Sequence, residues 1–410
     1  MKRRYLLLGS LYTSQFLPLG FFFIALTAIL RRQGASLERI GLLQLLAILW
    51  VLKGLWAPLV DRFGWGRLGH YRGWLIVLQS LMVVGVLSLI RVDAAGQPLL
   101  LFALVGVIAF LSATQDVAVD AVAVRLLEPE ERGPANGIQI AAGNLGFVLG
   151  GGGLLLVFDQ FGWVAAVATL AVLTAAPLLP VVYSLTPQTL TRSEDDGSRV
   201  SFESITRFFR QPGVGRWLWA VVPFFYLGIA IPTKLITPML VDAGWPLGQI
   251  GTMASIGGGV IGIAAALGAG LLLRSRRRRT ALVIIGTAQL VAIAAAVPLA
   301  AGASQPIAGL VAIIFLKASF AATGVAVFTV NMDWSRPQMA GTDYALLSAW
   351  AIIFADVVSA AGVSLAGLVG YGWTTALAVS LASIGLVSVA RLRTRDPVVA
   401  PSEVGAPVAL

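Results

Sequence analysis

The chain is dominated by apolar segments of membrane length that are separated by short polar loops. Twelve can be counted, at roughly 5–30, 40–59, 74–90, 98–123, 134–158, 162–184, 215–241, 247–273, 280–300, 306–330, 342–369 and 373–390. As helices, they are long enough to cross a hydrocarbon core of about 30 Å. Transmembrane strands would alternate apolar and polar side chains, and these segments do not. The sequence therefore predicts an all-α polytopic membrane protein with twelve transmembrane helices.

Composition leads to the same class. Hydrophobic residues make up 58% of the chain and charged residues only 12%, with a mean hydropathy of +0.88. An average soluble domain is about 25% charged. We interpret the apolar run that begins at Tyr5 as the first span and not as a cleavable signal peptide. The chain has no cysteine, which excludes disulfides and thiolate metal sites.

The basic residues predict the orientation. If the N-terminus is cytoplasmic, 22 of the 29 Lys and Arg residues lie on the cytoplasmic side, 4 lie on the other side and 3 lie inside spans. This bias agrees with the positive-inside rule and places both termini in the cytoplasm. The net charge of +10 therefore reflects membrane orientation, and we expect no nucleic-acid partner.

The longest polar break divides six spans from six spans. We expect an N-terminal six-helix bundle at 1–186, a cytoplasmic linker at 187–214, a C-terminal six-helix bundle at 215–392 and a cytoplasmic tail at 393–410. Within the linker, the segment 202–210 has the pattern of a short amphipathic surface helix. The exits of the second and eighth spans echo one another weakly, as expected of a duplicated unit.

The loop after the second span reads APLVDRFGWGR over 57–67. It resembles the signature of the major facilitator superfamily, a small residue followed by three residues and then Asp-Arg-x-Gly. This resemblance implies the fold of that superfamily, with two pseudo-symmetric six-helix bundles. It also implies a cytoplasmic gate motif made of Asp61, Arg62, Gly64 and Arg67.

Ionisable residues inside the spans are the candidate functional groups. Three are lysines and three are aspartates, and they are Lys53, Lys234, Lys317, Asp116, Asp120 and Asp356. Their formal charges cancel, which indicates ion pairs or proton-exchange pairs, because an unpaired charge inside a membrane is costly.

We expect a proton-coupling or charge-relay set of Lys53, Asp116, Asp120, Lys317 and Asp356. Competition between a proton and Lys53 for Asp116 would couple protonation to bundle movement. An interfacial position for Asp120, and a purely structural pair between Lys317 and Asp356 on consecutive spans, both remain open. Lys234 has no acid in its own span, so we expect it to bind an anionic group of a substrate.

Further polar and aromatic residues in the spans are candidates for lining a substrate cavity, and with Lys234 this set comprises Tyr12, Gln15, Gln115, Tyr226 and Trp350. Near the start of the eleventh span, Thr342 or Asp343 is expected to cap the helix. The glycines of the fifth span, which include Gly143, Gly146 and Gly150, are expected to allow close helix packing.

A closer resemblance follows from three runs, KGLWAPLVDR (53–62), SATQDVAVDA (112–121) and TDYALLS (342–348). They resemble the branch of the superfamily that holds the AmpG-like muropeptide permeases and the bacterial single-protein siderophore permeases. Muropeptide permeases of that branch commonly have two additional spans and tend to have Gln where Asp343 stands. Length therefore favours a ferric siderophore as substrate, with an anhydro-sugar peptide as the alternative. The resemblance implies the bacterial inner membrane and import driven by protons.

Other classes of function fit less well. A membrane-embedded enzyme would need a cluster of nucleophiles or metal ligands, and the chain has one histidine and no cysteine. We therefore expect no catalytic residues, no cofactor and no metal. A channel filter motif and a nucleotide-binding domain are also not evident. The sequence predicts a secondary transporter that works as a monomer, with a small molecule, protons and the lipid bilayer as its partners.

Overall fold

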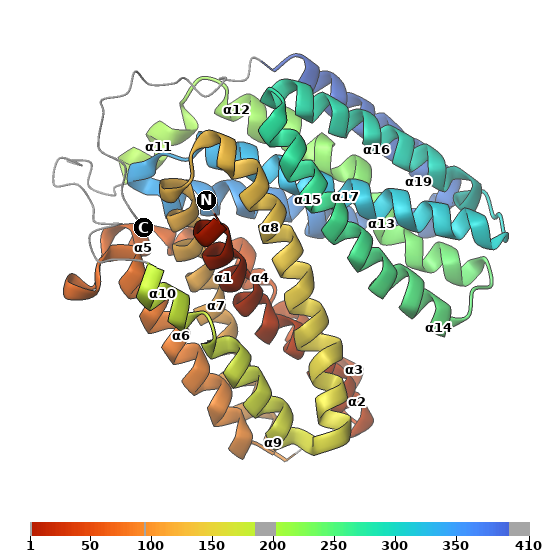
Figure 1. The fold of residues 1–410 in the computed structure, drawn as a ribbon. Coiled ribbons are helices and arrows are strands. Elements are labelled where there is room, and N and C mark those ends of the chain that lie inside the picture. Colours follow the sequence, from red (N-terminus) through yellow and green to blue (C-terminus); the bar gives the residue numbers. More distant parts are fainter. Residues whose placement is uncertain (1, 94–95, 185–201, 393–410) are drawn as a thin grey trace.

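A computed structural model describes residues 2–93, 96–184 and 202–392, and every regular element in these ranges is a helix (Figure 1). The predicted tail at 393–410 and the part of the linker before residue 202 lie outside the described residues. The linker helix predicted at 202–210 is confirmed as α11 (Phe202–Phe209), in which Glu203 and Arg207 form an ion pair.

The first half of the chain contains long helices joined by short turns. They are α1 (Lys2–Gly20) continuing through η1 (Phe21–Leu26) into α2 (Thr27–Arg32), α3 (Leu37–Leu45), α4 (Ile48–Leu52), η2 (Lys53–Leu55), α5 (Ala57–Arg62), η3 (Gly66–Leu68), α6 (His70–Ser88), η4 (Leu89–Arg91), α7 (Pro98–Leu126), α8 (Pro129–Phe147), η5 (Val148–Gly153), α9 (Leu154–Ala175) and α10 (Leu178–Ser184).

The second half repeats this plan. Its elements after α11 are α12 (Val214–Arg216), η6 (Trp217–Val221), α13 (Val222–Asp242), α14 (Leu247–Ile250), η7 (Gly251–Gly257), α15 (Gly258–Ser275), α16 (Arg278–Ala300), α17 (Pro306–Trp334), η8 (Pro337–Met339), α18 (Ala340–Ile352), η9 (Ile353–Val358) and α19 (Ser359–Ala390).

The helices account for the predicted crossings. Within the described ranges, nine helical stretches are long and apolar enough to span a membrane. Two of them, 129–183 and 337–390, contain a glycine of positive φ, Gly162 and Gly370, at which the chain turns back, so each holds two crossings. The segment 37–62 adds a crossing that is broken into short helices, which brings the count to twelve.

The helices gather into two bundles, one red to yellow and the other green to blue (Figure 1). The bundles meet at the end of the molecule where α7 ends and α8 begins, and they diverge toward α2 and α3 on one side and α14 on the other (Figure 1). We call the end where the bundles meet the basic end, because Arg125, Arg132, Arg274 and Arg278 lie there. Many large apolar side chains remain exposed on the outside, such as Leu99 and Leu368, as expected of a lipid-facing surface.

Glycines set the close helix contacts. In the first bundle, an added Cβ at Gly146 or Gly150 would fall within 3 Å of α1 atoms of Phe16 or Leu17, so the packing role predicted for these glycines is confirmed. Between the bundles, α8 and α15 cross at Gly133 and Gly270. A Cβ on Gly133 would lie 2.8 Å from the Gly270 carbonyl oxygen, so the two backbones are in direct contact near the basic end.

Candidate functional site: a charged cavity between two bundles

A cavity of about 640 Å³ lies between the two bundles. Both contribute to its wall: Lys53, Asp116, Asp120, Gln139 and Asn144 come from the first bundle, and Tyr226, Lys234, Lys317, Tyr344, Ser348 and Asp356 come from the second. Its size is typical of a site for an organic small molecule. All six of the ionisable residues that the sequence places inside spans line this one cavity.

On the first bundle, Lys53, Asp116 and Asp120 form a buried group that we call the Lys53 triad. The two aspartates are four residues apart on α7 and share a helix face, as the sequence predicts. The ammonium of Lys53 pairs with Asp116 and lies 3.4 Å from a carboxylate oxygen of Asp120. Lys53 is 2% exposed and Asp120 is 1% exposed, so an interfacial position for Asp120 is wrong.

A break in the second span positions Lys53. The helix ends at Leu52, and Lys53 begins the 3₁₀ turn η2, after which α5 starts with a proline at its second position. Gly54 faces Leu346 of the other bundle, and an added Cβ would lie 2.9 Å from the Leu346 side chain. The turn that holds Lys53 is thus itself in contact with α18.

Two residues predicted to line the cavity, Tyr12 and Gln15, instead donate hydrogen bonds to the carboxylates of the Lys53 triad. The hydroxyl of Tyr12 donates to Asp120 at 2.8 Å, and the amide of Gln15 donates to Asp116 at 2.5 Å. Both side chains are buried on α1 and are not part of the cavity wall. Each gives a buried carboxyl group a hydrogen-bond donor in addition to the nearby ammonium, which a buried acid requires.

The second bundle reaches the Lys53 triad through one side chain. The hydroxyl of Tyr344 on α18 lies 3.4 Å from the amide oxygen of Gln139 and 3.3 Å from that of Asn136. Gln139 in turn donates to Asp120 at 3.4 Å. A series of hydrogen bonds therefore links Asp120 to the second bundle through Gln139 and Tyr344. The sequence analysis did not select either of these two residues as part of the site.

The second bundle contributes its own charges to the cavity wall. Lys234 on α13 pairs with Asp356 on η9 at 3.1 Å. The expectation that Lys234 lacks a partner is therefore wrong, and so is the expected pair between Lys317 and Asp356. Within the described part of the chain, Lys317 on α17 forms no ion pair. Charges on consecutive spans need not face each other. Here α13 packs beside η9, so Asp356 pairs with Lys234 and not with Lys317.

Of the three remaining residues predicted to line the cavity, one does so and two do not. Tyr226 lines the cavity, where its ring contacts Phe320 at 6.3 Å between centroids. Gln115 is fully buried inside the first bundle and does not line the cavity. Trp350 donates its ring N–H to the Leu218 carbonyl oxygen at 2.7 Å and packs against Trp219, so it also lies outside the cavity wall.

At the basic end, the side chain of Asp61 on the first bundle forms hydrogen bonds with the second bundle. Its carboxylate accepts hydrogen bonds from the backbone N–H of Gly341 at 3.1 Å and of Thr342 at 2.7 Å, and from the Thr342 hydroxyl at 2.6 Å. Tyr71 of its own bundle donates a further bond at 2.7 Å. Asp61 is thus a helix cap for α18 that is supplied by the other bundle. We call this contact the Asp61 latch.

Among the described residues, the other gate-motif side chains form no hydrogen bond or ion pair with the second bundle. Arg62 is exposed and lies over the Phe63 ring, Arg67 is exposed, and Gly64 leaves room for the His70 ring. Arg125, which sequence reasoning did not select, donates to the Pro337 carbonyl oxygen at 2.8 Å across the interface. The prediction that Thr342 or Asp343 caps α18 is wrong, because the Thr342 hydroxyl donates to Asp61 and Arg336 binds the Asp343 carboxylate at 2.6 Å.

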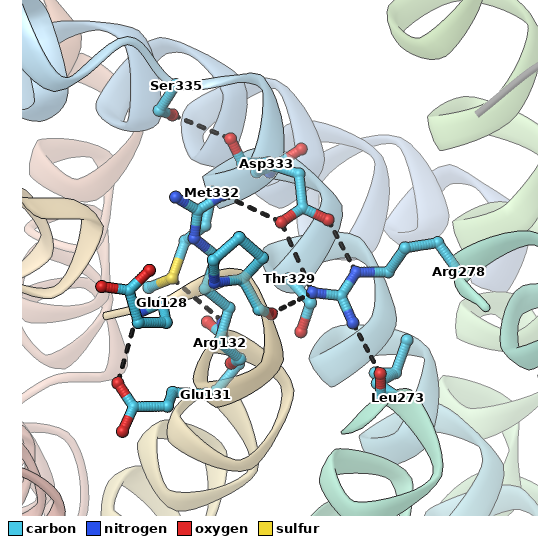
Figure 2. A network of polar contacts seen from close by, with 12 residues as sticks. Glu128, Glu131, Arg132, Leu273, Arg278, Thr329, Met332, Asp333 and Ser335 are labelled. Carbon is cyan, nitrogen blue, oxygen red and sulfur yellow. Dashed lines mark hydrogen bonds and ion pairs between the residues drawn. The ribbon is translucent and has the colours of Figure 1, made fainter. Parts of the chain in front are cut away.

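A second cross-bundle contact lies at the start of α8 (Figure 2). Asp333 of α17 binds Arg278 of its own bundle at 2.7 Å and Arg132 of the first bundle at 3.0 Å. The Arg278 guanidinium also donates to the Pro129 carbonyl oxygen at 2.5 Å and to the Leu273 carbonyl oxygen at 2.6 Å. We call this network, which the sequence did not reveal, the Arg278 latch.

The two latches lie at related places in the duplicated fold. The Asp61 latch holds the first turn of α18, which opens the eleventh crossing, and the Arg278 latch holds the first turn of α8, which opens the fifth. Each joins an exit of one bundle to a helix start of the other. Both latches hold the bundles together at the basic end, and their residues do not line the cavity.

Comparisons with known proteins agree with this architecture. The profile of the Major Facilitator Superfamily matches residues 8–352. The anhydromuropeptide permease of Escherichia coli K12 is 29% identical over 276 residues, covering 67% of this chain but only 56% of that protein, so the chain spans about half of that relative's length. A putative transporter AmpG 4 of Rickettsia felis is 25% identical over 373 residues, covering 87% of this chain and 88% of that protein.

Among solved structures, the transporter FucP in its outward conformation superposes with a TM-score of 0.71 at 12% identity, covering 94% of this chain and 97% of that one. Such a low identity supports the fold alone. The fold, the cavity between the bundles and the match over most of the chain lead to one conclusion. The protein belongs to the Major Facilitator Superfamily of secondary transporters, and it is similar to AmpG permeases.

Proposed function

We propose that the protein imports an anhydromuropeptide-like molecule, an amino sugar that bears peptide carboxylates, across the bacterial inner membrane together with protons. The observation on which the proposal depends is the cavity between the bundles, with the Lys53 triad on one wall and Lys234, Lys317 and Asp356 on the other. A cavity of this size that carries charges on both walls suits an organic anion better than an uncharged compound.

The relatives support the muropeptide alternative over the ferric siderophore that length favoured. The E. coli relative is named for an anhydromuropeptide, and neither of the two relatives described here is named for an iron chelate. The Rickettsia relative is aligned over 88% of its length, so a chain of about this length also bears the AmpG name. The missing spans are therefore no argument against a muropeptide.

Proton coupling is supported by the Lys53 triad. Two carboxylates share one ammonium in a buried site, so the second carboxylate is not neutralised. A proton that binds there removes the surplus negative charge and weakens the hold of Asp116 on Lys53. Because Lys53 sits in the turn beside α18 and Asp120 is linked to Tyr344, that change reaches the second bundle.

The gate is supported by the two latches. With the N-terminus in the cytoplasm, the basic end faces the cytoplasm, and both latches close it while the cavity lies on the other side. Alternating access then requires both to break as the bundles rock. The proposal assigns Asp61 and the Arg278 latch to the outward-facing state.

Uptake by proteoliposomes tests this function. The purified protein is reconstituted, a pH gradient is imposed, and accumulation of a radiolabelled anhydromuramyl tripeptide is followed with and without a protonophore. We expect accumulation above equilibrium that the protonophore abolishes. An excess of unlabelled ferric siderophore should not compete. Accumulation of the labelled chelate instead of the peptide would refute the muropeptide assignment, and protonophore-insensitive accumulation would refute proton coupling.

A further inference from the structure

The cavity wall of the second bundle has one cation more than it has anions. Lys234 is neutralised by Asp356 at 3.1 Å, whereas Lys317 forms no ion pair within the described residues. Both lysines line the same cavity. A cation inside a membrane span without a counter-ion is costly, and it is expected to face a cavity and serve function.

The surroundings of Lys317 increase the effect of its charge. Phe320, Gly324 and Phe328 follow it along the cavity face of α17, and its aliphatic stem lies against Gly258 of α15. An added Cβ at Gly258 would come within 3.1 Å of the Lys317 stem, so the glycine leaves space for the lysine. Apolar neighbours lower the local dielectric, which strengthens the attraction between the ammonium and an anion in the cavity.

We propose that Lys317, and not the paired Lys234, binds a carboxylate of the transported molecule. This inference rests on the proposed function and names the residue and the chemical group by which the site selects its substrate. The carboxylate would give Lys317 a counter-ion, as Asp356 already does for Lys234. Neutral analogues of the same shape would leave Lys317 uncompensated and would bind less tightly.

Charge balance links this carboxylate to the proton. The three lysines and three aspartates of the cavity sum formally to zero. Binding one carboxylate at Lys317 adds one negative charge, and protonating the Lys53 triad on the opposite wall removes one. The cavity therefore remains formally neutral when both ligands bind, which favours their binding together before the bundles move.

Binding to the full-length protein in lipid nanodiscs tests the proposal. Two matched pairs serve as probes: an anhydromuramyl tripeptide with its carboxamide form, and glucuronate with glucuronamide. We expect the wild-type protein to prefer the carboxylates by about 10- to 100-fold in Kd, the range of one charge-assisted hydrogen bond. Lys317→Gln should reduce this preference to near unity, and Lys317→Arg should retain most of it.

A charge-neutral change is the matched control. The double variant Arg207→Gln with Glu203→Gln removes one charge of each sign from the exposed ion pair of α11, which does not line the cavity, so the preference for carboxylates should survive in it. Neutralising an unpaired lysine should also leave the unfolding temperature of the ligand-free protein undiminished. A preference that persists in Lys317→Gln, or that disappears in the control, would overturn the proposal.

The two probe pairs separate this inference from the proposed function. If glucuronate binds through Lys317 and neither muramyl form binds, the anion site stands and the muropeptide function falls. If the muramyl peptide binds and is transported with no dependence on Lys317, the function stands and the anion site falls. Failure of both probes to show any dependence on Lys317 refutes the inference whatever the substrate is.

Discussion

Replacement of Asp61 by Asn is the most direct test of the gate, because the side chain keeps its shape and loses its charge. Asp61 is 2% exposed and accepts three hydrogen bonds from Gly341 and Thr342 at the start of α18. In Asn, the amide NH₂ takes the place of one carboxylate oxygen and faces N–H or O–H donors. The variant therefore loses at least one charge-assisted cross-bundle bond and the favourable interaction with the helix dipole.

The expected size of the effect follows from that loss. A hydrogen bond to a charged group contributes about 1.5–3 kcal/mol, which corresponds to about a 10- to 150-fold change in an equilibrium constant. In the proposed mechanism the latch exists only while the basic end is closed, so the whole difference acts on the equilibrium between the two conformations. Asp61→Asn should shift that equilibrium toward the conformation that is open at the basic end.

Spin-label distances measure the shift. The chain has no cysteine, so Gln33→Cys and Gln249→Cys can carry labels without background. Both positions are exposed and lie near α2 and α14, at the ends of the bundles that are remote from the basic end. Asp61→Asn should increase the population of short distances. Arg62→Gln, at an exposed position with no hydrogen bond or ion pair to the other bundle among the described residues, should match the wild type. Identical distributions in Asp61→Asn and wild type would refute the latch.

Two further predictions concern the triad and the second latch. Asp116→Asn should abolish accumulation against a gradient but keep exchange of internal for external substrate, because the proton site is lost while the cavity remains; full accumulation by this variant in proteoliposomes would remove Asp116 from coupling. Asp333→Asn should shift the label distances in the same direction as Asp61→Asn, since it leaves Arg132 and Arg278 without the anion between them. An unchanged distance distribution would show that the Arg278 latch is not part of the gate.

Local sequence properties determined the membrane class and the ionisable groups. Long apolar runs must bury their backbone polar groups as helices in lipid, which is a property of each segment alone. The spacing of Asp116 and Asp120 likewise predicted a shared helix face, and the small residues of the fifth span predicted close packing. The cost of isolated charges in a membrane also indicated that Lys53 would need an acid, and Asp116 meets that need.

Only the tertiary structure decided which charges pair and which residues face the cavity. Sequence order suggested Lys317 with Asp356, but the packing of α13 beside η9 brings Lys234 to that acid. Tyr12 and Gln15 look like cavity residues in the sequence, yet the rotation of α1 places them behind the carboxylates. Two partners of Asp61 are backbone N–H groups 280 and 281 residues away, and backbone groups leave no signature in a sequence. Composition and periodicity determine where a helix forms and which of its faces is apolar. Which residues become its neighbours is determined by how all the helices pack together.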